Sequence, residues 1–263
     1  MRLVKAHAYG NDFLLAEDPP VPLDDAAALA RAVCGRHRGI GADGLILYRA
    51  GPRGAAMRLL NADGSYSEVS GNGVRCLAAL LAARAPGERG FTVDTDAGSK
   101  RLELLQRDPR GRMTFRAEMG EPERIERIIL SGRESCTVTT LRVGNPQCVM
   151  LVSAAELTEA MLHKFGPFLT SHPHFPAGTN VELAHVESPG RVRILIWERG
   201  VGPTEASGTG ACASAVAAIA HGGASRDVDV ISPGGTQRVE WRDDGLYLTG
   251  WAELICEAEW LQR

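Results

Sequence analysis

The chain has 263 residues, of which 44% are hydrophobic and 23% are charged, and its formal net charge is −3. This length allows two domains of ordinary size, each with its own core. The weak negative charge, spread without a basic stripe, gives no electrostatic support for a nucleic acid or an anionic membrane as partner. No apolar run approaches the roughly 18 residues of a membrane span. Because the six cysteines are scattered and mostly lie in apolar segments, we expect reduced thiols and a cytoplasmic protein.

The chain opens with two short strand patterns, joined by a turn signal at Gly10-Asn11-Asp12. An alanine-rich helix is predicted next, from about residue 24 to Cys34. The loop after it contains Gly39, Gly41 and Gly44, which satisfy the letters of a dinucleotide-binding fingerprint. That fingerprint leaves a strand and opens a helix, whereas this loop follows a helix and enters a strand. We therefore predict a loop that shapes a site, and no nucleotide cofactor.

A glycine turn then opens the central helix of the first half. The turn reads Ser70-Gly71-Asn72-Gly73, and the helix is predicted over 73–83. Ser70 stands where an N-cap hydroxyl accepts a hydrogen bond from the free N–H groups of the first turn. Such a helix start is positively polarised and can hold an anion such as a carboxylate. Small apolar residues nearly all round the helix predict burial on every side.

The second half of the chain repeats this order. A helix is predicted from about Ser153 to Phe165, stopped by Gly166-Pro167, and Ser207-Gly208-Thr209-Gly210 opens a second central helix over 210–220. The offset of 137 residues that joins Ser70 to Ser207 recurs along the chain. It also relates residues 41–43 to 178–180, and Asn61 to Glu198. A repeat this long in only two copies indicates a domain duplication.

These patterns predict an α+β protein with two pseudo-symmetric lobes. Each lobe is expected to be a curved, mostly antiparallel sheet around one central helix, with the active cleft between the lobes. The polar, proline-containing stretch 120–124 is the predicted boundary. The N-terminal lobe then spans 1–118, with the C-terminal segment of about 252–263 packing back on it. The C-terminal lobe spans 119–251.

Ordered motifs along the whole chain resemble those of the diaminopimelate epimerase family. They are G-N-D-F at 10–13, G-I-G-A-D-G at 39–44, N-A-D-G-S at 61–65, G-N-P at 144–146 and W-E-R-G-V-G at 197–202. The resemblance implies a cofactor-independent isomerase that converts LL-diaminopimelate to meso-diaminopimelate in lysine and peptidoglycan biosynthesis. It also implies a homodimer, a small amino-acid substrate, and neither metal nor pyridoxal phosphate.

Inverting a carbon that bears hydrogen requires one group to remove the proton and another to return it on the opposite face. Because an α-hydrogen beside a carboxylate is weakly acidic, the negative charge that develops must be stabilised, as two helix N-termini would do. In the family the two bases are cysteines. Here Ser70 and Ser207 occupy those positions, and Gln147 occupies the usual histidine position. A serine hydroxyl is a far weaker acid than a thiol, so we expect impaired epimerisation.

The family positions that hold substrate are retained. The resemblance assigns substrate binding to Asn11, Asn61, Gly71, Asn72, Asn145, Asn180, Glu198, Arg199, Gly208 and Thr209, and a catalytic role also to Glu198. An arginine fork on a carboxylate and a glutamate on an ammonium suit a zwitterionic end. From the residues alone, Glu198 and Arg199 could equally form an ordinary ion pair. Cys76 and Cys212 are interpreted as packing groups, with a substitute thiol as the alternative.

Three hypotheses remain open at this level. The chain is a double Cys→Ser form of a diaminopimelate epimerase, which leaves Gln147 unexplained. Alternatively, it is a divergent isomerase or cyclase that acts on another small amino acid. The third hypothesis is a non-catalytic amino-acid-binding protein.

Overall fold

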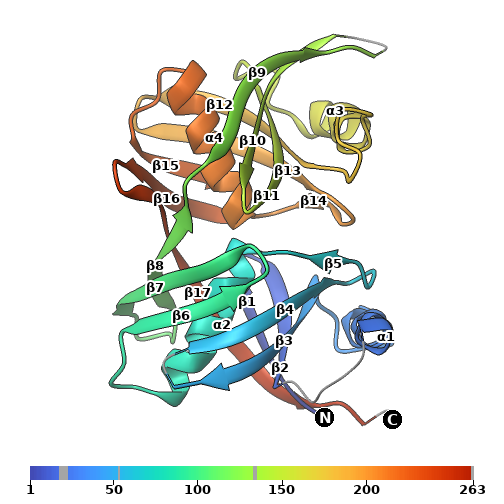
Figure 1. The fold of residues 1–263 in the computed structure, drawn as a ribbon, viewed down its shortest axis with the longest axis vertical. Coiled ribbons are helices and arrows are strands. Elements are labelled where there is room, and N and C mark those ends of the chain that lie inside the picture. The colour runs from blue at the N-terminus through green and yellow to red at the C-terminus, as the bar shows by residue number, and fades with distance from the viewer. Residues whose placement is uncertain (18–22, 53, 133–134, 262–263) are drawn as a thin grey trace. The chain divides into compact units, whose positions relative to one another are not determined.

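The computed structural model describes residues 1–17, 23–52, 54–132 and 135–261, and the chain divides into two compact units (Figure 1). Unit 1 comprises residues 1–117 and 250–263, and unit 2 comprises residues 118–249. The sequence places the two boundaries after residues 118 and 251. Strands predominate and helices are few in both units, so the predicted α+β class is confirmed.

Unit 1 contains the first two helices and the strands around them. In chain order its elements are β1 (Arg2–Ala8), β2 (Asn11–Glu17), α1 (Leu23–Cys34), β3 (Gly44–Gly51), β4 (Gly54–Asn61), β5 (Tyr66–Ser67), α2 (Gly71–Arg84), β6 (Gly90–Thr95), β7 (Gly98–Arg107) and β8 (Met113–Gly120). Strands β1 and β2 form the predicted hairpin. The β2–β3 and β4–β6 pairs are parallel because α1 and α2 provide the crossovers that parallel neighbours require.

Unit 2 repeats this order. Its elements are β9 (Glu123–Leu130), β10 (Cys136–Val143), β11 (Asn145–Leu151), α3 (Glu159–Thr170), β12 (Asn180–Ser188), β13 (Arg191–Glu198), β14 (Gly202–Thr204), α4 (Gly208–His221), β15 (Asp227–Ser232), β16 (Gly235–Arg242) and the start of β17 (Gly245–Glu259). The β11–β12 and β13–β15 pairs are parallel across α3 and α4. The equivalent parallel pairs show that the sequence repeat is a repeat of structure.

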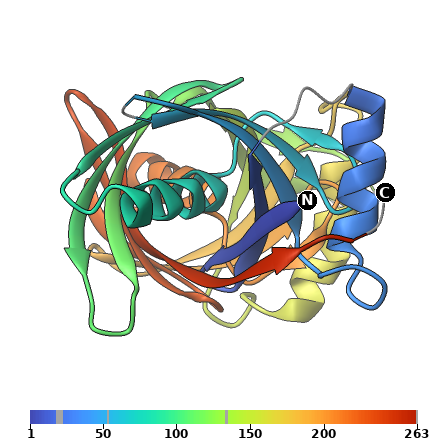
Figure 2. The same ribbon diagram turned by 90° about the horizontal axis from the view of Figure 1, so that it is seen from below.

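The last strand returns the chain to unit 1. In β17 the residues from Glu253 to Glu259 pair antiparallel with β1, and β17 also pairs with β8. The strands of unit 1 lie around α2, as Figure 2 shows. In α2 every residue from Gly71 to Ala82 is buried, and α4 is buried in the same way from Gly208 to Ala218. Helices rich in alanine and glycine can be surrounded in this way because their small side chains let the strands approach closely.

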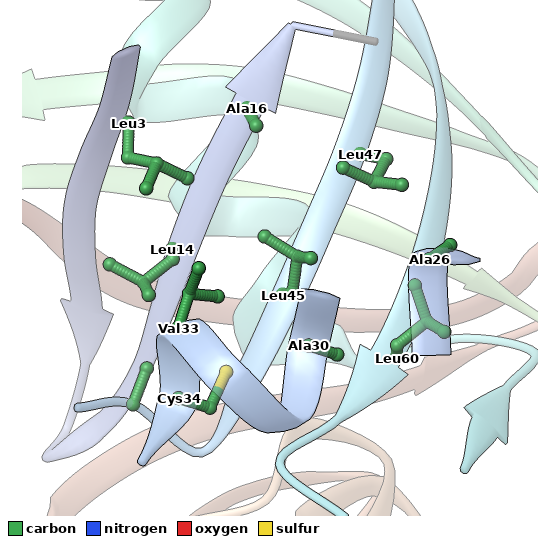
Figure 3. Packing of buried hydrophobic residues seen from close by; sticks show 11 residues of the cluster. Leu3, Leu14, Ala16, Ala26, Ala30, Val33, Cys34, Leu45, Leu47 and Leu60 are labelled. Carbon is green, nitrogen blue, oxygen red and sulfur yellow. The ribbon is translucent and has the colours of Figure 1, made fainter. Parts of the chain in front are cut away.

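Helix α1 differs from the central helices because it buries one face. Its buried residues recur at helical spacing, namely Ala26, Ala30, Val33 and Cys34. Figure 3 shows this stripe against leucines of the neighbouring strands, among them Leu14, Leu45, Leu47 and Leu60. The opposite face, with Asp25 and Arg31, is exposed.

Helix α3 departs from the prediction, because it begins at Glu159 and continues through Gly166 and Pro167 to Thr170. The hydroxyl of Thr158 accepts a hydrogen bond from the Met161 N–H and so caps the helix start. Gly166 is a packing position and not a stop. A Cβ there would lie 2.7 Å from the Trp197 ring, well inside van der Waals contact. No helix in the described parts of the chain is long and apolar enough to cross a membrane.

Candidate active site

Ser70 caps the start of α2. Its backbone is extended, with φ −131° and ψ 124°, and its Oγ accepts a hydrogen bond of 3.1 Å from the Gly73 N–H. The side chain is half-buried. This geometry leaves other N–H groups of the first turn free of helical partners, which is the arrangement that favours an anion.

Asn72 connects this helix start to the β1–β2 turn. It is fully buried, its Nδ2 donates to Asn11 Oδ1 at 3.1 Å, and its Oδ1 accepts from the guanidinium of Arg75. Arg75 is also fully buried and lies over the Tyr9 ring at 5.9 Å. Two of the predicted binding residues, Asn11 and Asn72, are therefore in direct contact. The guanidinium of Arg75 was not among the predicted binding residues.

A charged network of Asp43, Arg36, Asp12 and Lys5, none of them a predicted binding residue, holds Asn11. Asn11 Nδ2 donates to Asp43 Oδ2 at 2.9 Å, and Arg36 bridges Asp43 and Asp12 at 2.7 and 3.1 Å. Lys5 Nζ lies 2.9 Å from Asp12. Burial opposes ionisation of Asp12, but hydrogen bonds from Lys5 and Arg36 outweigh it and lower its pKa. Burial dominates at Asp43 and raises its pKa.

Asn61 lies at the end of β4, and its side chain forms a hydrogen bond within the turn that follows. Its Nδ2 donates to Ser65 Oγ at 2.9 Å within the turn that follows the strand. The residue is half-buried. Asn61 thus does not join the hydrogen bonds between Asn11 and Asn72.

Ser207 caps α4 as Ser70 caps α2. Its φ and ψ are −137° and 129°, and its Oγ accepts from the Gly210 N–H at 3.2 Å. The Thr209 hydroxyl lies 3.5 Å from the same oxygen. Ser207 is only 2% exposed, so the second cap is more deeply buried than the first. Gly208 is buried in the same turn.

Other predicted residues of unit 2 lie at the ends of adjacent strands. Gln147 is fully buried on β11, and its Nε2 donates to Asn145 Oδ1 at 2.5 Å. Asn180 Oδ1 accepts from the Arg199 backbone N–H at 2.9 Å, while Arg199 Nη1 donates to the Ala177 carbonyl at 2.8 Å. Glu198, half-buried, is the last residue of β13, the strand that pairs with β12.

Glu182 was not predicted, and it lies on the same face of the sheet as this group. In β12 the neighbouring side chain, Val181, belongs to the cluster with Cys148 and Trp197, so Glu182 points to the opposite face, toward α4. A Cβ on Gly210 would lie 2.7 Å from Glu182 Oε1. Burial, followed by repulsion from Glu198, raises the pKa of Glu182 well above its usual range. Its position in a run of apolar strand residues gave no signal that it approaches the helix start.

The strand registers refine the predicted repeat. Gly44 pairs with Phe13 in β2–β3, and Asn180 pairs with Gln147 in β11–β12. Gly44 and Asn180 are also the first residues of their strands, so they are equivalent here and the local offset is 136 and not 137. The predicted match of Asp43 to Asn180 is therefore displaced by one residue. By the same register Glu182 is equivalent to Ile46.

The cysteines near the caps are packing groups in this structure. Cys76 and Cys212 are fully buried inside the central helices. Burial raises the pKa of the Cys76 thiol, and likewise that of Cys148 on β11. A thiol with a raised pKa is a poor base at neutral pH. Among the described residues, no group of three or more His, Cys, Asp or Glu side chains is arranged to hold a metal ion.

Comparisons with known proteins show the family and the fold of the chain. The family model for diaminopimelate epimerase matches residues 3–125 and 139–255. The chain is 43% identical to the diaminopimelate epimerase of Desulforudis audaxviator (strain MP104C), with 100% of both proteins covered. It is 37% identical to that of Heliobacterium modesticaldum, with 98% of this chain and 99% of the relative covered. A solved probable proline racemase from Agrobacterium radiobacter K84 shares the fold, with a TM-score of 0.77 at 17% identity over 100% of this chain and 93% of that one.

Proposed function

The chain belongs to the diaminopimelate epimerase family, and from this premise we propose that it binds diaminopimelate and inverts one α-carbon by proton transfer. In this proposal each repeat supplies one acid–base position, Ser70 in unit 1 and Ser207 in unit 2. The reaction belongs to lysine biosynthesis. The observation that carries the proposal is the pair of serine-capped helix starts, one in each repeat, with the same backbone geometry.

The helix starts supply the stabilisation that the chemistry requires. Removing an α-proton places negative charge on the adjacent carboxylate, which first-turn N–H groups and the helix dipole stabilise. Neither first turn contains an acidic residue that would oppose this. In this proposal Asn72, which donates to Asn11, and Asn180, which accepts from the Arg199 N–H, bind the substrate's amino and carboxylate groups.

The serine hydroxyls limit the rate in this proposal. A thiol with a pKa near 8.5, lowered further at a helix N-terminus, gives a useful fraction of base at neutral pH, whereas a hydroxyl gives almost none. Every tenfold loss of rate corresponds to about 1.4 kcal/mol of barrier. We therefore propose that the protein binds its substrate and turns it over slowly. A protein that binds the amino acid without any turnover is the second candidate, because both base positions are altered while the binding residues are retained.

Restoring the thiols tests the proposed reaction. Ser70→Cys combined with Ser207→Cys should raise the exchange of the diaminopimelate α-hydrogen with deuterated solvent by orders of magnitude, and epimerisation with it. Mass spectrometry and chiral chromatography measure the two quantities. If the doubly substituted protein neither exchanges nor epimerises diaminopimelate, the proposed activity is wrong.

Calorimetry separates substrate binding from turnover. Arg199→Ala should weaken diaminopimelate binding at least tenfold, because the proposal assigns the guanidinium to a substrate carboxylate. Arg193→Ala is the matched control, since Arg193 lies on β13, the strand that ends just before Arg199, is half exposed and pairs with Glu187. Equal affinities for the two variants would refute the role of Arg199.

A further inference from the structure

Glu182 is a carboxyl group buried at a helix start. It is fully inaccessible to solvent, and neither of its oxygens has a hydrogen-bond partner among the described residues. A Cβ on Gly210 would lie 2.7 Å from Glu182 Oε1 and 3.2 Å from Ser207 Oγ. The carboxyl and the cap hydroxyl therefore border the same point in the first turn of α4.

The equivalent position in unit 1 is apolar. A Cβ on Gly73, the counterpart of Gly210, would lie 3.0 Å from Ile46 Cδ1 and 3.6 Å from Ser70 Oγ. The strand registers make Ile46 the counterpart of Glu182, and both side chains are fully buried. An apolar isoleucine side chain can therefore fill this position beside the helix start, and a carboxyl is not needed for packing. A buried carboxyl without partners is strongly destabilising when it is ionised, so its presence in unit 2 calls for a chemical reason.

The surroundings of Glu182 favour its protonated form. Burial raises the pKa of Glu182, and Glu198 on β13 raises it further. Cys148 on β11 also interacts with it, and the first turn of α4 holds no charged side chain. A neutral carboxylic acid can donate a proton, which a serine hydroxyl alone does poorly.

We propose that Glu182 serves Ser207 as a proton donor and acceptor, so that the second cap has a buried carboxyl beside it where the first has Ile46. The inference rests on the proposed function. When the substrate carbanion is reprotonated, the Ser207 O–H bond breaks as the new C–H bond forms, and the Glu182 proton passes to Ser207 Oγ. The carboxylate that remains accepts a proton when the steps run backwards. The transfer requires the Glu182 carboxyl and Ser207 Oγ to come within hydrogen-bond distance, and both already border the Gly210 position.

Single thiol variants test this asymmetry. In Ser70→Cys the thiol removes the proton, and Ser207 with Glu182 returns one on the other face. In Ser207→Cys the other face has only Ser70 beside Ile46. We expect Ser70→Cys to epimerise diaminopimelate at least tenfold faster than Ser207→Cys. Equal rates would overturn the inference.

A second substitution separates the relay from a structural role. Glu182→Gln in the Ser70→Cys protein should lower epimerisation at least tenfold while α-hydrogen exchange, which the new thiol performs, stays within threefold. Ile46→Val is the matched control and should change neither rate by more than twofold. Glu182→Asp, which keeps the carboxyl, should keep at least a third of the epimerisation rate. An equal loss of exchange and epimerisation in the Gln variant would overturn the relay, as would an Asp variant as slow as the Gln variant.

The two proposals can fail separately. If the double thiol variant is inactive on diaminopimelate and does not bind it, the proposed function fails. If that variant is active while Glu182→Gln leaves the Ser70→Cys protein unchanged, only the role of Glu182 fails.

Discussion

The starts of α2 and α4 have the same backbone but different surroundings. Both are capped by serine with nearly identical φ and ψ. Ser70 is half-buried beside Ile46, whereas Ser207 is 2% exposed beside Glu182. In unit 1 the polar groups at the turn are the amides of Asn11 and Asn72 and the guanidinium of Arg75. In unit 2 they are the Thr209 hydroxyl, the Gln237 amide, which donates to the Ser207 carbonyl at 3.4 Å, and the unbonded carboxyl of Glu182.

This difference shows that the duplication preserved the backbone conformation of the helix starts but not the side chains that surround them. The helix dipole and the cap depend on the backbone and a glycine turn, so they are kept in both repeats. The side chains behind each turn come from separate strands and can change independently. Each prediction below alters one unit and uses the other as its reference.

The largest expected effect is on stability, from removing the second polar residue of each turn. Asn72→Ala should lower the free energy of unfolding by about 2–4 kcal/mol, because buried partners on Asn11 and Arg75 each lose a hydrogen bond. Thr209→Ala should cost less than about 1.5 kcal/mol, since its contact with Ser207 is 3.5 Å long. Urea unfolding followed by circular dichroism measures both. A larger loss for Thr209→Ala would contradict the comparison.

Asp12 in unit 1 and Glu182 in unit 2 should change the free energy of unfolding in opposite directions as pH rises. The lowered pKa of Asp12 means that its stabilisation is present above the unfolded pKa near 3.9 and is lost as pH falls. The raised pKa of Glu182 has the opposite consequence. Its contribution to the free energy of unfolding is fully present below the unfolded pKa near 4.3 and is lost as pH rises.

Unfolding at pH 4, 6 and 8 measures this opposition. Asp12→Asn should destabilise by about 1–3 kcal/mol at pH 8 and by less at pH 4. Glu182→Gln should gain stability relative to the starting protein by about 1 kcal/mol or more between pH 4 and pH 8. Asp243→Asn, at a fully exposed position, is the control and should show no trend. Parallel trends for Asp12 and Glu182 would refute the assigned environments.

The smallest expected effect is a difference in thiol reactivity. The thiol introduced by Ser70→Cys should react with a disulfide reagent at neutral pH about tenfold faster than the one introduced by Ser207→Cys. The reason is that deeper burial raises a thiol pKa and restricts access. Both variants require Cys256→Ser, because Cys256 is the exposed native cysteine and the other five are buried. Faster reaction at position 207 would reverse the order of burial that we infer.

Local signals in the sequence were enough to predict the repeat, the two capped helix starts and their burial. Ser70 and Ser207 are recognisable because capping depends on residues within one turn of each other. The retained motifs likewise indicated the family. The sequence also predicted a helix stop at Gly166-Pro167, which failed because that glycine accommodates a ring of Trp197, 31 residues further along the chain.

Only the tertiary structure placed Glu182 and Asp43 beside the predicted residues. Their contacts depend on which strand pairs with which and in what register, and a shift of one residue would turn Glu182 to the other face of β12. The offset of 136 that makes Glu182 the counterpart of Ile46 is visible in the strand pairing and not in the motifs. The sequence therefore determined the backbone of each half-site. The long-range packing of strands against the helix starts decided which side chain stands behind each serine, because that choice depends on residues distant in the chain.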